Sequence, residues 1–105
     1  MYVLTVLYLN TIQEHFLFHL HTNAIKKYIA LLKEHNYRFC QEAKILKPDH
    51  YIKNPQALAE VMNAYEDYEH LGNFKIHYNK SEPQDLSDLE NQRPNYVEAQ
   101  QKDLL

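Results

Sequence analysis

The first ten residues, MYVLTVLYLN, decide how the rest of the chain can fold. β-branched and aromatic side chains predominate from residue 2 to residue 9, which is typical of a β-strand. The even positions are apolar, and so are Val3, Leu7 and Leu9 among the odd ones. Because successive side chains of a strand point to opposite faces, this strand is apolar on both faces and needs both of them covered.

The next segment, residues 11–22, admits two interpretations. Thr11 and Glu14 have the spacing of a capping box, which predicts a helix from Ile12 to about residue 35. The apolar stripe that supports this helix consists of Leu17, Leu20, Ala24, Tyr28 and Leu31. The alternation in HFLFHLHT instead indicates a strand over 15–22, hairpinned to the first, with Asn23 capping a shorter helix. We favour the helix because two signals agree on it.

The remainder of the body alternates between strand and helix patterns. Alternating apolar residues predict a half-buried strand over 37–46, and a short strand is expected over 50–53. Asn54-Pro55 predicts a helix start, and Gly72 its end. The helix between them carries an apolar stripe of Leu58, Val61, Met62, Tyr65 and Tyr68. Residues 73–79 then predict a last strand.

This order, β-α-β-(β)-α-β, is that of an α+β, ferredoxin-like domain with two helices on one face of an antiparallel sheet. Two helices leave the other face of the first strand bare. We therefore expect a homodimer with sheets packed face to face; the alternative is a monomer whose tail folds back over that face. The body is residues 1–79. Residues 80–105 carry six acids and three bases and form a polar acidic tail.

Composition excludes several classes of protein. The 105-residue chain has a formal charge of −3 and no basic stretch suited to nucleic acid. It has no apolar run near the roughly 18 residues of a membrane span. Its single Gly excludes a Gly-rich phosphate loop, so no organic cofactor is expected. Cys40 is the only cysteine, which suits a reducing cytoplasm.

The chain resembles the dimeric α+β-barrel superfamily, and within it the YciI-like and muconolactone-isomerase-like proteins. The resemblance is carried by MYVLTVLYL, by IKKYIALLKEHN at the end of the first helix, and by NPQALAEVMNAYEDYEHLGNFKIHYNKSEP. It implies a dimeric barrel. YciI-like proteins usually have a His on the first helix where this chain has Ile25, with His21 one turn earlier. Their Asp-Pro-aromatic step corresponds to residues 66–68, which keep an acid and lack the Pro.

Two functions follow as hypotheses. In the first, a small ligand binds in the cleft between sheet and helices, and His21 acts as general acid or base, oriented by Glu66 or Asp67. In the alternative, the chain is a non-catalytic module, an inhibitor or immunity-type binder, that meets a protein partner through its acidic tail and aromatic surface. Several of the nine tyrosines facing one cavity would suit a small aromatic or cyclic ligand.

Three further residues could take part in chemistry or have only a structural role. His15 and His19 have the i,i+4 spacing of metal ligands on a helix, but solvated histidines without a metal are expected. Cys40 is expected to be a small buried residue and not a nucleophile.

Overall fold

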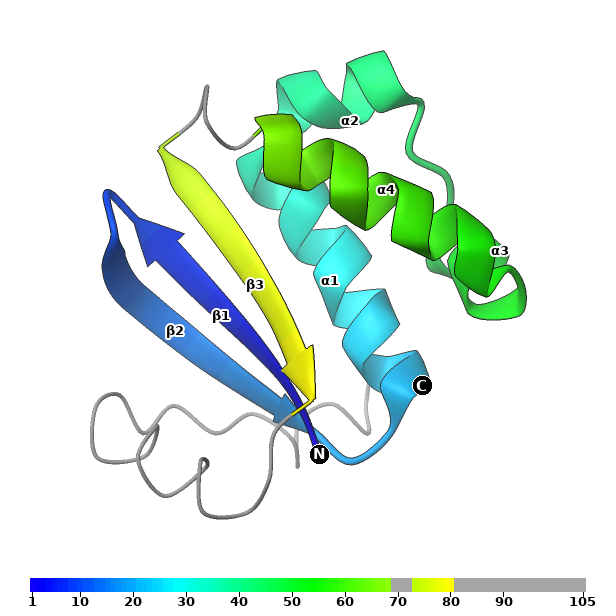
Figure 1. Cartoon of the computed structure of the whole chain (residues 1–105), viewed down its shortest axis with the longest axis horizontal. Coiled ribbons are helices and arrows are strands. Elements are labelled where there is room, and N and C mark those ends of the chain that lie inside the picture. Colours follow the sequence, from blue (N-terminus) through cyan, green and yellow to red (C-terminus); the bar gives the residue numbers. More distant parts are fainter. Residues whose placement is uncertain (69–72, 81–105) are drawn as a thin grey trace.

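The computed structural model describes residues 1–68 and 73–80, and the elements within them form an α+β structure (Figure 1). In chain order they are β1 (Tyr2–Tyr8), β2 (Thr11–Phe18), α1 (His21–His35), α2 (Tyr37–Ala43), α3 (Pro48–Lys53), α4 (Pro55–Tyr68) and β3 (Phe74–Lys80). The predicted α+β class is confirmed.

The three strands of these residues form one antiparallel sheet with the order β2-β1-β3, so β1 is paired on both edges. Leu4 lies opposite Phe16 on one neighbour and Tyr78 on the other. In Figure 1 all four helices lie on one side of this sheet. The even-numbered side chains of β1 point to the helices, where Leu4 and Val6 join the core.

The helix predicted from Ile12 is wrong in its first part, because Thr11–Phe18 is a strand. The rival interpretation is correct in the hairpin with β1 but not in its bounds, because it placed the strand over 15–22 and residues 21–22 belong to the first helix. Leu9 and Asn10 connect the strands with φ values of 50° and 64°, the left-handed conformation that a two-residue hairpin turn requires. The residues of the expected capping box therefore lie in β2, and α1 begins only at His21, without the expected Asn23 cap.

The strand predicted over 37–46 is also wrong: its first seven residues form the helix α2. Two pairs with i,i+4 spacing stabilise it, Arg38 with Glu42 (Nε–Oε1 3.1 Å) and Tyr37 with Gln41 (2.7 Å between Oη and Nε2). Phe39 is buried, whereas Tyr37, which the alternation placed inward, is 67% exposed.

The short strand expected over 50–53 is the helix α3, and Pro48 stands in its first turn, where a missing N–H costs nothing. Tyr51 is buried on the inner side of this helix. Its hydroxyl accepts a hydrogen bond from the Leu46 N–H at 2.9 Å, which closes the link between α2 and α3.

The second half of the prediction is confirmed in α4 and β3. Asn54 Oδ1 accepts the Ala57 N–H at 3.3 Å, as expected of an N-cap before Pro55. The predicted stripe of α4 faces the core, with Leu58 and Tyr65 buried and the rest half-buried. Gly72, the predicted helix stop, lies outside the described residues.

The predicted order β-α-β-(β)-α-β is therefore corrected to β-β-α-α-α-α-β for the described residues. The reason is that three segments (11–18, 37–46 and 50–53) were assigned the wrong type of secondary structure from their local patterns of apolar residues. What survives is the layer arrangement, an antiparallel sheet with helices on one face (Figure 1). β3 extends to Lys80, one residue past the domain boundary expected after residue 79, and the rest of the expected acidic tail lies outside the described residues.

The hairpin turn gives a first prediction. A left-handed conformation costs an ordinary L-residue about 1–2 kcal/mol, and Asn tolerates it better than Leu. Leu9 is 63% exposed, so its replacement removes little packing. We expect Leu9→Asn to raise the free energy of unfolding in urea by about 0.5–1 kcal/mol.

The control is Leu46→Asn, which makes the same chemical change at a residue that is 50% exposed and has no positive φ. It should give no gain. Equal effects of the two substitutions would contradict the turn argument.

Candidate functional site

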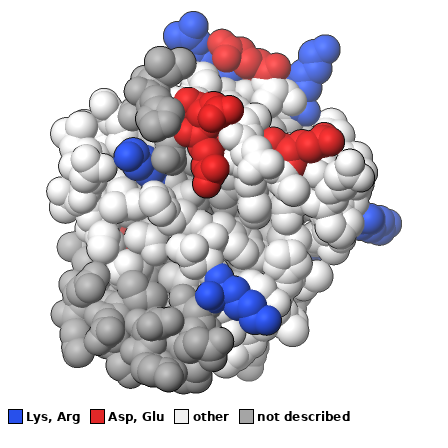
Figure 2. Space-filling view, viewed as in Figure 1, with Lys and Arg blue, Asp and Glu red and all other residues white. Residues whose placement is uncertain are grey.

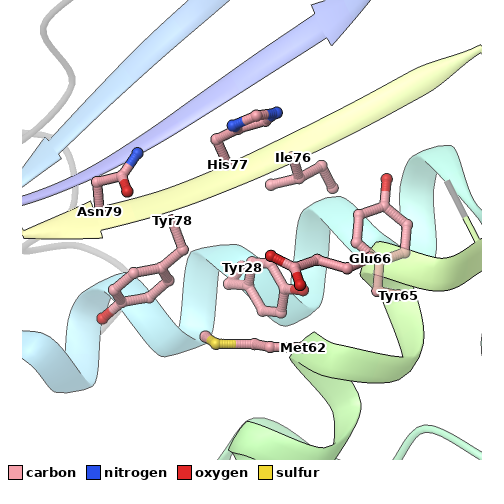
Figure 3. A pocket seen from close by; sticks show the side chains of 8 residues that line it. All are labelled: Tyr28, Met62, Tyr65, Glu66, Ile76, His77, Tyr78 and Asn79. Atoms are coloured by element: carbon pink, nitrogen blue, oxygen red, sulfur yellow. The ribbon is translucent and has the colours of Figure 1, made fainter.

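A cavity of about 130 Å³ lies between β3, α1 and α4 (Figure 3). It is lined by Tyr28, Met62, Tyr65, Glu66, Ile76, His77, Tyr78 and Asn79. Each wall comes from a different element, since Tyr28 belongs to α1, residues 62–66 to α4 and residues 76–79 to β3.

Only part of this lining consists of side chains that face the cavity. In Figure 3 the side chains of His77 and Asn79 point away from the helices, as expected of odd-numbered residues of β3. These two residues therefore contribute main chain. Among the described strands β3 is an edge strand, so alternate backbone N–H and C=O groups on its outer side face away from β1.

Tyr65 is the fixed wall of the cavity. It is 1% exposed, and its hydroxyl donates to the Phe74 carbonyl at 3.1 Å while accepting from Asn36 Nδ2 at 2.8 Å. These two bonds join α4 to the start of β3 and to the junction of α1 and α2. The ring position is thus set by three elements at once, which keeps this wall rigid.

Tyr78 connects the cavity to the first turn of α1. Its hydroxyl is 2.5 Å from Nδ1 of His21, the first residue of that helix. The rings of Tyr2 and His21 are 5.1 Å apart, and Tyr28 meets Tyr78 edge-on at 6.0 Å. Tyr78 therefore stands in an aromatic cluster with one side on the cavity and its hydroxyl on a histidine.

Burial raises the pKa of Tyr78 well above its ordinary value, and Tyr2 adds a smaller effect in the same direction. The phenol therefore keeps its proton to a higher pH than an ordinary tyrosine does. When the His21 ring is neutral, the phenol donates to Nδ1; when the ring is protonated, Nδ1–H donates to the phenol oxygen. The pair can form in both charge states of the histidine.

Of the three residues predicted to act together, only Glu66 is part of the cavity lining. Glu66 lines the cavity, and in Figure 3 its side chain lies beside Tyr28. Glu66 and Asp67 are both exposed, and Asp67 is not part of the lining. Within the described residues, neither carboxylate is hydrogen-bonded or ion-paired with His21, whose hydrogen-bond partner is a phenol.

Sequence reasoning missed the role of Tyr78, although signals for it existed. The alternation of the last strand placed Tyr78 inward, and the excess of tyrosine pointed to an amphipathic pocket. What was lacking was the start of α1, because a helix beginning at Ile12 puts His21 in its middle. Only a helix that begins at His21 brings that ring to the end of β3.

The other residues singled out from the sequence lie elsewhere. The expectation of a solvated side chain is wrong for His15, which is 2% exposed on β2 with Nδ1 3.1 Å from the Thr5 hydroxyl, and confirmed for His19, which is exposed beyond the end of that strand. Cys40 is buried as expected, and this burial raises the pKa of its thiol, while Lys33 acts weakly in the opposite direction. Across residues 1–68 and 73–80, no three His, Cys, Asp or Glu side chains gather as metal ligands would.

A larger hollow of about 470 Å³ lies on the other side of α1, between that helix and β2. Its apolar floor is already covered by polar side chains of α1. Lys27 Nζ lies 4.5 Å above the Phe16 ring, and His35 stacks on Phe74 with ring centres 4.6 Å apart. Long polar side chains that cover apolar surface in this way are typical of a solvated groove. We therefore take the cavity beside Tyr78 as the candidate site.

In the comparisons with known proteins, no family model, no curated protein and no solved structure matches the chain.

None of the described helices combines the length and the apolar character that a membrane span needs. On the face shown in Figure 2, basic and acidic side chains are interspersed, and neither sign fills a broad area of the described surface.

The raised pKa of Tyr78 gives a second prediction. In the unfolded chain this phenol ionises near pH 10, whereas in the folded chain it ionises at higher pH. Its contribution to stability is therefore complete below about pH 10 and is lost as pH rises above that value. We expect Tyr78→Phe to lose less stability than the parent protein between pH 9.5 and about 11.5, as measured by urea unfolding at each pH.

Tyr37→Phe is the matched control, because Tyr37 is 67% exposed. Its pH dependence should follow that of the parent protein. If the free energy of unfolding of Tyr78→Phe and of the parent fell equally with rising pH, the Tyr78 phenol would ionise at the same pH in the folded and the unfolded chain, which would contradict the prediction.

Proposed function

We propose that the chain binds a small, ring-sized ligand that carries a positive charge in the cavity between β3, α1 and α4. The observation that carries this proposal is a cavity walled by three tyrosine rings with the side chain of Glu66 in its lining (Figure 3). Aromatic faces attract cations, and a carboxylate adds the opposite charge.

The size of the cavity limits the ligand. Its volume of about 130 Å³ is close to that of an engineered apolar cavity of roughly 150 Å³ that accepts benzene. Drug-sized ligands occupy roughly 300–1,000 Å³. One ring with a short substituent therefore fits, whereas a nucleotide does not.

The polarity of the walls sets the orientation of such a ligand. Tyr28, Met62 and Ile76 provide an apolar surface for the ring. Glu66 provides the negative group, and the outer backbone edge of β3 provides hydrogen-bonding groups. An amine is recognised at the carboxylate while the ring packs against the tyrosines.

The remaining expectations from the sequence stay predictions. These are acid–base chemistry by His21 with Glu66 or Asp67, the dimeric barrel of the YciI-like resemblance, and a cytoplasmic location. The alternative function as a protein-interaction module depends on the acidic tail, which lies outside the described residues.

Benzylamine is a suitable probe, because it combines one ring with one positive charge. We expect it to shift the backbone amide resonances of residues 76–79 and of α4 around Glu66, with a Kd in the millimolar range. Benzyl alcohol, which keeps the ring and lacks the charge, should bind at least about fivefold more weakly, since a cation beside aromatic rings contributes about 1 kcal/mol or more.

The variants separate the charge from the shape of the site. Glu66→Gln should weaken benzylamine at least about fivefold and leave benzyl alcohol unchanged. Glu60→Gln is the control on the same helix, because Glu60 is exposed and outside the lining. Met62→Trp should block both probes by filling the cavity. Resonance shifts confined to other parts of the chain, or equal affinities in Glu66→Gln and the parent, would contradict the proposal.

A further inference from the structure

The sheet has a second face, opposite the helices. By strand alternation and pairing register, the second face consists of Val3, Thr5, Leu7, Ile12, His15, Leu17, Lys75, His77 and Asn79. Val3 lies opposite Leu17, and Thr5 lies opposite both His15 and His77. All four described helices lie on the other side of the sheet (Figure 1).

The centre of the second face is nevertheless buried. Val3, His15 and Leu17 are each 2% exposed. Val3 and Leu17 are not part of the core cluster between the sheet and the helices, which contains their neighbours Leu4, Phe16 and Phe18. Their burial therefore has a source other than the four helices.

These exposed fractions are those of one copy of the chain, so the cover does not require a second copy. The burial also falls off towards β3, where His77 and Asn79 are exposed. The cover thus lies over β1 and β2 more than over β3. A segment of the same chain meets this description if it starts near the sheet and is long enough to cross it.

The chain beyond β3 has the necessary reach. β3 ends at Lys80, which pairs with Tyr2 at the start of β1, so the following residues leave the sheet at its end. The 25 residues from 81 to 105 can span up to about 80 Å, whereas a strand of seven or eight residues is about 25 Å long.

Charge complementarity supports the same occupant. Among the described residues of the second face, Lys75 carries a formal positive charge, His15 and His77 are formally neutral at pH 7, and there is no carboxylate. Residues 81–105 carry six acids and two bases. Leu86 and Leu89 are three residues apart, the spacing of one helical face, and acids flank them on both sides.

We propose that residues 81–105 of the same chain cover the second face, with Leu86 and Leu89 packed against Val3 and Leu17. The tail then completes the fold as the second layer over β1, in place of the face-to-face homodimer expected from the sequence.

The test compares two double variants of the full chain that add the same charge. Leu86→Asp with Leu89→Asp places two carboxylates in the proposed contact and should lower the Tm by about 5–10 °C. Gln84→Asp with Ser87→Asp has the same spacing on the opposite side of a helix and should shift the Tm by less than about 2 °C. Equal Tm values for the two variants would overturn the proposal.

The molar mass of the full chain, measured by light scattering, provides the second readout. One protomer is expected. A dimer whose Tm is insensitive to the Leu86/Leu89 change would identify a second copy as the cover and overturn the proposal.

A third readout does not depend on the destabilised variant folding. The chain has no Trp, so a single one reports its own surroundings. Leu86→Trp should emit at shorter wavelength and be quenched less by acrylamide than Ser87→Trp. Identical emission and quenching from both positions would show that neither side of the segment is buried, which would likewise overturn the proposal.

Discussion

β1 is the constraint on which the rest of the structure depends, because its side chains are buried on both faces while its backbone is paired on both edges. Leu4 and Val6 are at most 2% exposed on the helix side, and Val3 is 2% exposed on the other. A central strand of this kind leaves no polar face for solvent. The helices provide one layer. The burial of Val3 therefore requires another, and this requirement follows from the first ten residues alone.

The parts of the fold that could be predicted are those in which one local pattern has no competitor. Asn54-Pro55 and the stripe of α4 specify a helix, and the inward positions of β3 follow from alternation. Residues 11–18 showed signals for both a helix and a strand. The left-handed turn at Leu9 and Asn10 and the pairing with β1 decide between them, and Leu9 is an unusual residue for such a turn. Over 37–46, alternate apolar residues concealed the i, i+3, i+4 set formed by Asn36, Phe39 and Cys40, all of which are buried.

The candidate site also has a part that could be predicted from the sequence and a part that could not. Glu66 was a candidate because the YciI-like resemblance aligned residues 66–68 with an acidic step, and it does line the cavity. His21 was predicted as a site residue, but its partner depends on where α1 begins. Moving the start of this helix from Ile12 to His21 places the histidine beside Tyr2 and Tyr78, at the end of the sheet where β3 finishes. Side-chain partners that come from three elements cannot be read from any one of their patterns.

The cavity and the second face are connected through β3. This strand is held on one edge by β1 and at its start by the Tyr65 hydroxyl, which bonds the Phe74 carbonyl. Its even-numbered side chains wall the cavity, and its odd-numbered side chains, Lys75 and His77, lie on the second face. A layer that packs over β1 on the second face therefore reaches this wall of the cavity only through the pairing of β1 with β3. Because packed layers transmit small shifts with little loss, contacts on either side of β3 influence the geometry on the other.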